Sequence, residues 1–439
     1  MGGDIALWML ALLITLILLG VHIGVGFAIC SALGVWLMLD SPEAALAILG
    51  NTAYEAVRKD VFAVIPLFVL MGDFISRSGA ASDLYQICNR VLHRLPGRLA
   101  IATIAGNTVF AAVTGVSIAA AAAFSRIAYP EMKKHGYKQT FALGAVAGSA
   151  CLGMLIPPSV LLIVWAILTE MSVGALFIAG VIPGIILALL FSLYVVSSAY
   201  LKPSIAPAAN DGAEALSRLE ARAQAVGGIG ILVLILLVIG GIWTGVFTPT
   251  EAAGFGAIGA LLIGLVKGMR GKQILEAIFQ AGKTTAPIMF LLITAQMYSR
   301  LLAMGGAVNY IKTLFLTMGL DPFMIIGLMV LIWILLGMLI DSVSIILLTV
   351  PIFAPIAMAL GIDPLAFAIF GILVIEAGLL TPPFGLLVYT VKGSVPDPTA
   401  TLSKIFIGSF PYFVLILVAA FIVLLFPVTA NWLPAYMLR

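Results

Sequence analysis

The chain has 439 residues, of which 63% are hydrophobic and only 9% are charged. A soluble globular protein carries about 25% charged residues. The apolar residues also gather in long runs, so the composition predicts an all-α protein that crosses a membrane several times. The formal net charge of +3 is too small to indicate a nucleic-acid partner, and the ten-residue alternating pattern of a transmembrane barrel does not appear.

The residue types that commonly carry catalysis do not cluster in this sequence. Its three cysteines and three histidines are widely scattered, so their spacing predicts no zinc site. Gly282-Lys283-Thr284 resembles the end of a phosphate-binding loop, but the earlier glycine of that motif falls at Ala277. The sequence also shows no nucleophile elbow. We therefore do not expect an enzyme.

Twelve apolar runs follow one another along the chain. The first, residues 5–20, comes after an N-terminus without basic residues, so we expect a retained helix rather than a cleaved signal peptide. The other runs are 23–39, 61–76, 98–128, 140–170, 174–201, 225–246, 250–267, 284–303, 321–360, 363–392 and 403–427.

Two of these runs, 98–128 and 321–360, are too long for one plain span. Their centres are polar or contain glycine, at Thr114-Gly115 and Asp341-Ser342. We expect each to be a re-entrant helical hairpin that enters and leaves on the same side. The second arm of the first run, 116–128, is too short to cross ~30 Å of hydrocarbon. Two full spans would return the chain to the same side, so that alternative stays open.

Positive charges predict the orientation. With the N-terminus outside, 16 of the 22 lysines and arginines fall on the inner side and 5 on the outer side, while Arg126 lies within the first hairpin. This bias follows the positive-inside rule. The outer set is Arg58, Lys59, Arg300, Lys312 and Arg439.

The same topology divides the chain into two halves, each with five spans and one hairpin. Because five is odd, the second half is inverted relative to the first. We expect a first repeat over 1–201, a polar cytoplasmic linker over 202–224 and a second repeat over 225–439. Segments 80–95 and 268–283 are amphipathic and basic, which favours interfacial helices over plain loops.

One motif occurs once in each half. Val-Ser-Ile at 116–118 is followed by Gly-x-Leu-x-Pro-Pro at 153–158, and the pattern repeats at 343–345 and 378–383. Each Pro-Pro falls inside a hydrophobic run, where a continuous helix cannot tolerate it. We therefore expect broken helices over 140–170 and 363–392. Paired interruptions in corresponding positions indicate the binding site of a secondary transporter.

The breaks and tips gather hydroxyl and carbonyl oxygens, which suit a hard cation such as Na⁺. Helix N-termini at the same places present partial positive charge to an anion. Close helix packing is the alternative reason for such small residues. The predicted Na⁺ ligands are Thr114, Gly115, Ser117, Gly153, Ile156, Asp341, Ser342, Ser344, Gly378 and Thr381. The predicted substrate contacts are Val116, Pro157, Ser159, Ser342 and Pro382.

Two ionisable residues lie deep in the predicted spans. Asp341 is at the second tip, and Glu376 comes two residues before Gly378. Charge at such depth is costly and indicates function by default. For Glu376, proton carriage and structural pairing both remain open. Arg126 lies toward the base of its hairpin, which favours a structural or headgroup role.

Many short stretches resemble those of one protein family. In their order and spacing they are similar to the large membrane subunit of tripartite ATP-independent periplasmic (TRAP) transporters, the DctM-like family. The matching stretches are 66–68 with Gly72, 95–97, 110–123, 130–132, 136–137, 156–159, 176–180, 183–184, 248–253, 361–364 and 378–385.

The resemblance implies the transport subunit of a Na⁺-coupled importer of small organic acids in the bacterial inner membrane. It implies an elevator mechanism, a small four-helix membrane subunit and a periplasmic binding protein as partners. By motif match, each tip with its facing break would form one Na⁺ site, with substrate between the tips. A stand-alone Na⁺- or H⁺-coupled anion transporter of related architecture is the alternative.

The sequence departs from the family pattern in two places. The early Gly-x-Pro becomes Gly24-Val25-Gly26, which affects a scaffold bend. The first tip, often Ser-Gly-Ser-Ser, is Thr114-Gly115-Val116-Ser117. That tip has one hydroxyl fewer, so main-chain carbonyls are expected to supply more of its ligands.

Overall fold

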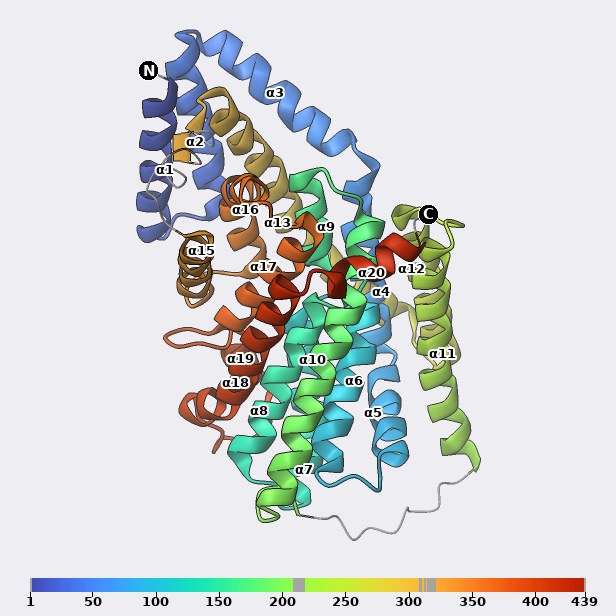
Figure 1. Ribbon diagram of the computed structural model, residues 1–439. Helices are drawn as coiled ribbons and strands as arrows, with labels where there is room; N and C mark the ends of the chain where they lie inside the picture. The colour runs from blue at the N-terminus through green and yellow to red at the C-terminus, as the bar shows by residue number, and fades with distance from the viewer. Residues whose placement is uncertain (1, 208–217, 308–309, 312, 314–320, 438–439) are drawn as a thin grey trace.

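The computed structural model describes residues 2–207, 218–307, 310–311, 313 and 321–437, and the regular structure in these residues is helical throughout (Figure 1). The predicted all-α fold is confirmed. Of the expected linker, residues 208–217 lie outside the described part of the chain.

In the first half, side-chain caps and glycines set many helix boundaries. The hydroxyls of Ser41 and Ser172 accept hydrogen bonds from the third backbone N–H beyond them, while Gly79 and Gly97 take the left-handed conformation before a helix. The elements are α1 (Gly2–Leu18), α2 (Ile23–Leu39), α3 (Pro42–Arg58), η1 (Asp60–Ala63), α4 (Val64–Arg77), α5 (Ala80–Val91), α6 (Arg98–Thr114), α7 (Ser117–Lys134), α8 (Gln139–Ala150), η2 (Cys151–Met154), α9 (Val160–Thr169) and α10 (Val173–Leu201).

The second half uses acidic and hydroxyl caps in the same way. Asp363 accepts from the N–H of Ala366, and Thr248 and Glu251 form a reciprocal capping box. The elements are α11 (Arg218–Trp243), α12 (Pro249–Val266), α13 (Gly271–Met304), α15 (Pro322–Gly337), α16 (Ser342–Ala359), α17 (Pro364–Gly378), α18 (Leu386–Ser394), α19 (Leu402–Leu425) and α20 (Val428–Met437).

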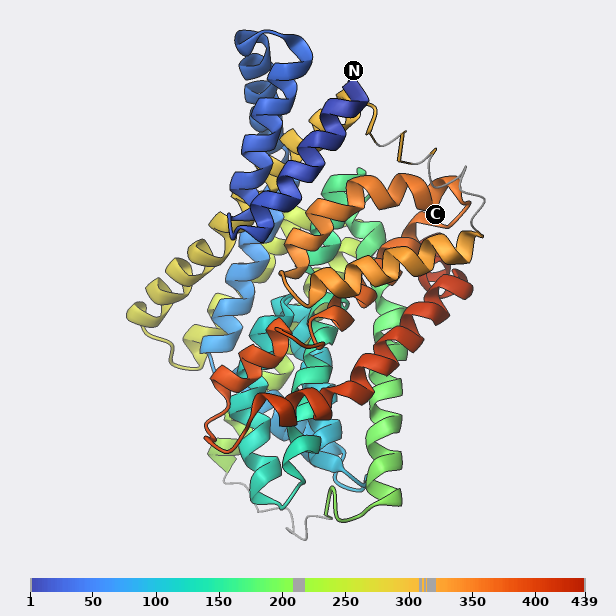
Figure 2. The same cartoon turned by 90° about the vertical axis from the view of Figure 1, so that its left-hand side faces the viewer.

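The two halves repeat one order of elements: apolar helices, a helical hairpin, a broken helix and a long helix. The hairpins are α6–α7 and α15–α16, and the broken helices are α8–η2–α9 and α17–α18. The first hairpin reaches the middle of the molecule from the end that carries residues 202–207, here called the linker end. The second hairpin approaches obliquely from the opposite end, here called the α3 end (Figures 1 and 2). The hairpins, breaks and inversion follow the prediction.

The second arm of the first hairpin is longer than expected. α7 runs to Lys134 and has 18 residues, which is about 27 Å of helix. The expected short arm over 116–128 is therefore wrong, because the helix continues through Pro130 to Lys134. The hairpin is instead defined by its turn at Gly115, which is buried in the centre of the fold.

One of the two predicted interfacial helices exists as a separate element. α5 is bent by 68° from the preceding helix, with Gly79 in the left-handed conformation at the break. The segment 268–283 differs from the prediction, because α13 runs from Gly271 to Met304 as one 34-residue helix. Nothing between residues 283 and 284 interrupts the helical hydrogen bonds, and Pro287 removes only one donor. The structure also adds α3, which was not predicted from the apolar runs.

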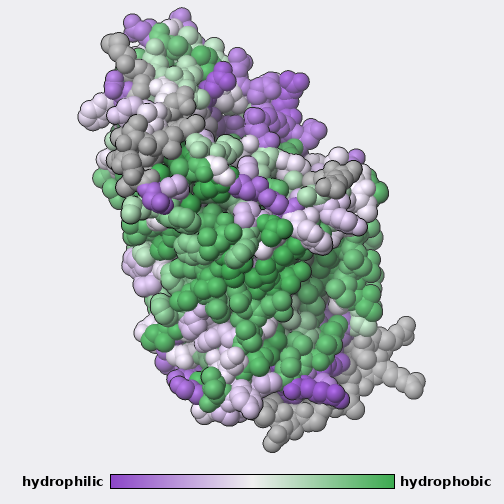
Figure 3. All heavy atoms as spheres, in the orientation of Figure 1, coloured by the Kyte–Doolittle hydropathy of each residue, from purple (hydrophilic) through white to green (hydrophobic). Residues whose placement is uncertain are grey.

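The outer surface is suited to lipid. Six helices in the described residues are long and apolar enough to cross a membrane, or seven if the bent pair counts as one span. Leucines on these helices point outward, including Leu193, Leu236 and Leu262, each more than half exposed. Figure 3 shows the resulting apolar band between two polar ends. In water this surface would promote aggregation, whereas in a bilayer it is solvated by acyl chains.

An aromatic cluster packs the second hairpin against both broken helices. The ring centroid of Trp333 on α15 lies 6.4 Å from that of Trp165 on α9 and 5.3 Å from that of Phe353 on α16. Phe367 on α17 lies 5.9 Å from Trp165. The indole N–H of Trp333 donates to Thr349 Oγ1 at 2.8 Å, which satisfies its one polar atom. We call α6–α9 and α15–α18 together the hairpin body.

Candidate functional site

The first hairpin tip touches the first helix break through main-chain atoms. Gly115 ends α6 in the left-handed conformation (φ 62°), and its carbonyl accepts a hydrogen bond from Val160 N at 3.2 Å. A Cβ at Gly115 would lie 2.5 Å from the Pro158 carbonyl oxygen. A Cβ at Gly153 would lie 3.0 Å from Ser117 Cα. Only glycine permits this approach, so the structure brings together the tip and break that the motif paired.

The second tip and break are close in the same manner. A Cβ at Gly337, on the arm that leads to the tip, would lie 2.7 Å from Gly378 Cα. Asp341 caps α16, where its Oδ1 accepts from Ser344 N at 3.0 Å and its Oδ2 accepts from Ser344 Oγ at 2.5 Å. Thr381 Oγ1 donates to the Gly378 carbonyl at 2.5 Å. Five predicted residues therefore lie at the second tip and its break, since Ser342 directly follows Asp341.

The remaining predicted residues differ in their exposure. Pro157 and Ser159 are buried at the first break, where the Ser159 hydroxyl donates to the Met154 carbonyl and caps α9. Ile156 packs on Gly184 of α10. At the second break, by contrast, Pro382 is exposed. The tip residues Thr114 and Ser117 are buried, and Val116 is half-buried.

Glu376 is the buried carboxylate of this region. Its side chain lies on α17 just before the second break and is 1% exposed. Its Oε1 accepts a hydrogen bond from Ser342 Oγ at 2.8 Å. Ser117 of the first tip lies close enough to interact electrostatically with the same carboxylate. The sequence indicates Glu376 as a functional candidate but does not predict its contacts with Ser342 and Ser117.

Two cavities lie between the hairpin body and the helices outside it. One of about 480 Å³ is lined by the second tip, by Phe384 and Tyr389 after the second break, and by Ile23 of α2. The other, of about 810 Å³, lies between α3 and α13 on one side and α9, α16 and α17 on the other. Lys59 and Arg300 line the larger cavity, together with Glu55 and Glu170. The hairpin body therefore has space beside it at two places.

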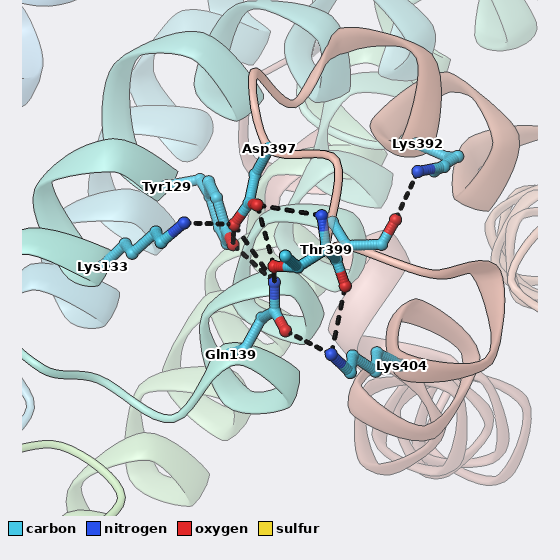
Figure 4. A network of polar contacts seen from close by, with 8 residues as sticks. Tyr129, Lys133, Gln139, Lys392, Asp397, Thr399 and Lys404 are labelled. Atoms are coloured by element: carbon cyan, nitrogen blue, oxygen red, sulfur yellow. Dashed lines mark hydrogen bonds and ion pairs between the residues drawn. The ribbon is translucent and has the colours of Figure 1, made fainter.

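A polar cluster near the linker end was not predicted (Figure 4). Asp397 lies in the connection between α18 and α19, and its Oδ2 accepts from Tyr129 Oη at 2.5 Å and from Lys133 Nζ at 2.7 Å. Gln139 and Thr399 add further hydrogen bonds to the same carboxylate. The bonds from Lys133, Tyr129 and Thr399 hold the pKa of Asp397 well below its usual value.

This Asp397 cluster joins the two halves of the chain. Tyr129 and Lys133 are on α7, and Gln139 begins α8, whereas Asp397 and Thr399 belong to the second half. Lys404 of α19 completes the cluster by donating to Gln139 Oε1 at 2.6 Å. The sequence signal was weak, because Pro396-Asp397-Pro398 indicates only a turn. The cluster fixes the base of the first hairpin to the end of the second broken helix.

The fold and site together define a multi-pass helical membrane transporter built from two inverted repeats. The family model of the tripartite ATP-independent periplasmic transporter DctM component matches residues 10–429, so the chain belongs to this family. The members of this family named below are permeases rather than enzymes, and this chain is likewise not an enzyme.

Several relatives cover most of the chain. The C4-dicarboxylate TRAP transporter large permease protein DctM of Pseudomonas aeruginosa is 33% identical over 405 residues, or 91% of this chain and 92% of the relative. The ectoine TRAP transporter large permease protein TeaC of Halomonas elongata is 30% identical over 436 residues, with 97% and 98% covered. The sialic acid large permease protein SiaM of Vibrio cholerae is 29% identical over 374 residues, with 84% and 85% covered.

A solved structure has a similar fold. The crystal structure of the YdaH transporter of Alcanivorax borkumensis matches with a TM-score of 0.60 and covers 90% of this chain and 89% of that chain. The two sequences are only 15% identical, so the match concerns the fold alone.

Proposed function

We propose that this chain is the transport subunit of a Na⁺-coupled importer of small organic acids. The hairpin body carries ion and substrate, and it moves across the bilayer as an elevator against the outer helices. The observation that carries the proposal is the close main-chain approach, at glycines, of each hairpin to a broken helix. A membrane protein tolerates non-helical main chain at depth where it is buried in protein or lines a cavity.

The donor set at the tips fits Na⁺. Asp341 and Ser344 offer hard oxygens at the second tip, Thr381 offers one at the second break, and the first break offers the carbonyls next to Gly153. Ser117 Oγ at the first tip is buried and has no hydrogen-bond partner among the described residues. An orphaned buried hydroxyl is costly unless an ion or water satisfies it. These residues would hold Na⁺, whose charge would attract an anionic substrate.

The substrate is proposed to be a carboxylate between the tips. α7 and α16 begin at the tips, and α9 and α18 begin after the breaks, so four helix N-termini present partial positive charge there. Two of the relatives are named for acids, C4-dicarboxylate and sialic acid. The 480 Å³ cavity beside the second tip is large enough for a ligand of this size.

The family also suggests partners and a location. We propose a periplasmic binding protein that delivers the acid, and a small four-helix membrane subunit that braces the outer helices. The location is the bacterial inner membrane with a periplasmic N-terminus. The α3 end would then face the periplasm, and the linker end, with Lys133 and Lys404, would face the cytoplasm.

The test is uptake by proteoliposomes that contain the complete transporter. Ser117→Ala and Ser344→Ala each remove one proposed Na⁺ ligand. Each is expected to raise the Na⁺ concentration for half-maximal uptake about tenfold, which corresponds to a loss of about 1.4 kcal/mol in binding free energy. Ser192→Ala is the matched control, because the one hydrogen bond of its hydroxyl within the described residues is to Ala188 O of its own helix. Uptake that persists without Na⁺ and follows a proton gradient would reject the coupling. Uptake without the binding protein would favour a stand-alone transporter.

A further inference from the structure

The carboxylate of Glu376 lies where the two repeats meet. Its Oε1 accepts from Ser342, the first residue of α16, and Ser117, the first residue of α7, lies beside the same carboxylate. Both hairpin tips therefore face one acidic side chain that is carried by the second broken helix. Glu376 is therefore not part of one tip-and-break site alone, because it lies beside residues of both tips.

The Glu376 carboxylate has few hydrogen-bond partners, although it is almost completely buried. Its Oε2 is buried without a hydrogen-bond partner among the described residues, and the same holds for Ser117 Oγ. No basic side chain of the described residues forms an ion pair with it. An ionised carboxylate buried with a single hydrogen bond costs several kcal/mol unless a counter-charge is present.

The neighbouring groups do not supply that counter-charge. Cys151 of η2 directs its thiol at the Glu376 main-chain carbonyl, with a sulfur-to-oxygen distance of 3.8 Å. Asp341 at the second tip is itself acidic and is hydrogen-bonded to Ser344. The N-termini of α7 and α16 contribute only partial charges, of roughly +0.5 each. Three oxygen-bearing side chains thus converge with one full negative charge among them.

We propose that Glu376, Ser117 and Ser342 hold a monovalent cation that is shared by the two repeats. The inference rests on the proposed Na⁺ coupling and adds a ligand and a position to it. Hydroxyl and carboxylate oxygens suit Na⁺, and the two unpartnered atoms are the free ligands that a cation would take. Glu376 supplies the formal charge. A bound cation ties the first tip, the second tip and the second broken helix together, so both hairpins close over the substrate cavity only when the ion is present.

The experiment measures Na⁺ binding directly rather than transport. The purified full-length protein is unfolded thermally across a series of NaCl concentrations, with choline chloride keeping the ionic strength constant. Binding to the folded state raises the midpoint temperature of unfolding (Tm) with ligand concentration. We expect Glu376→Gln to raise the Na⁺ concentration for half of this stabilisation at least tenfold, and Ser342→Ala to raise it several-fold. KCl in place of NaCl tests selectivity.

Asp397→Asn is the matched control, because it removes one carboxylate charge from the other structural cluster. It is expected to lower Tm equally at all Na⁺ concentrations and to leave the half-stabilising concentration unchanged. A Glu376→Gln protein with the same half-stabilising concentration as wild type would overturn the shared cation and leave Na⁺ coupling intact. A wild-type protein that Na⁺ does not stabilise would overturn the coupling itself. If Glu376→Gln does not fold, Ser342→Ala decides, since an unchanged Na⁺ response there contradicts the proposal.

Discussion

Alanine at Gly115 is expected to reduce substrate uptake at least tenfold more than alanine at Gly79. Both glycines have positive φ, 62° and 76°, so each substitution carries a left-handed strain of roughly 1–2 kcal/mol. Only at Gly115 does the new methyl group meet main chain, at 2.5 Å from the Pro158 carbonyl oxygen, while nothing lies within 4 Å of it at Gly79. The difference in uptake between the two variants therefore measures the effect of the contact between the first tip and the first break.

The measurement is initial uptake rate in proteoliposomes, normalised to folded protein from size-exclusion chromatography. Gly115→Ala is expected to separate the first tip from the first break and so to misplace Ser117 and the carbonyls near Gly153. Its Na⁺ dependence should also weaken. Equal loss of uptake in the two variants would show that backbone strain alone matters, and that this contact contributes nothing to transport.

Removal of the Asp397 carboxylate is expected to lower both the stability and the uptake of the protein. Asp397→Ala removes the acceptor for Tyr129, Lys133 and Thr399 at once. The base of the first hairpin then loses its link to the connection before α19. We expect Tm to fall by several degrees and uptake to fall because the two halves of the hairpin body no longer move together. Glu55→Ala is the control, since its pair with Arg58 is exposed.

The same cluster predicts the direction of an acid effect on stability. The pKa of Asp397 is lower in the folded protein than its usual value of 3.8. A lowered folded-state pKa means that the stabilisation is fully present above the unfolded pKa and is lost as the pH falls below it. Wild-type Tm should therefore decline more steeply below about pH 4 than that of Asp397→Ala. Parallel declines would contradict the assigned hydrogen bonds.

The sequence predicted the hairpins and broken helices well because their causes are local. Proline lacks the N–H that a helix needs, so Pro157-Pro158 and Pro382-Pro383 had to interrupt their runs. The glycines at 115 and 153 could be recognised as permissive, but only the structure shows that Gly115 meets the main chain of Pro158 and that Gly153 meets that of Ser117. The expected arm over 116–128 is too short because it follows the apolar run, whereas α7 continues through Pro130 to Lys134.

The sequence by itself determined the membrane location, the all-α class and the two repeats, since burial of apolar residues in lipid and backbone breaks depend on composition and local pattern. Tertiary structure alone decided which polar groups meet. Ser342 reaches Glu376 across 34 residues, and Tyr129 reaches Asp397 across 268. A local sequence pattern says little about such pairs. The free energy of each interaction depends on how deeply the two groups are buried and how close they lie, and both are set by tertiary packing.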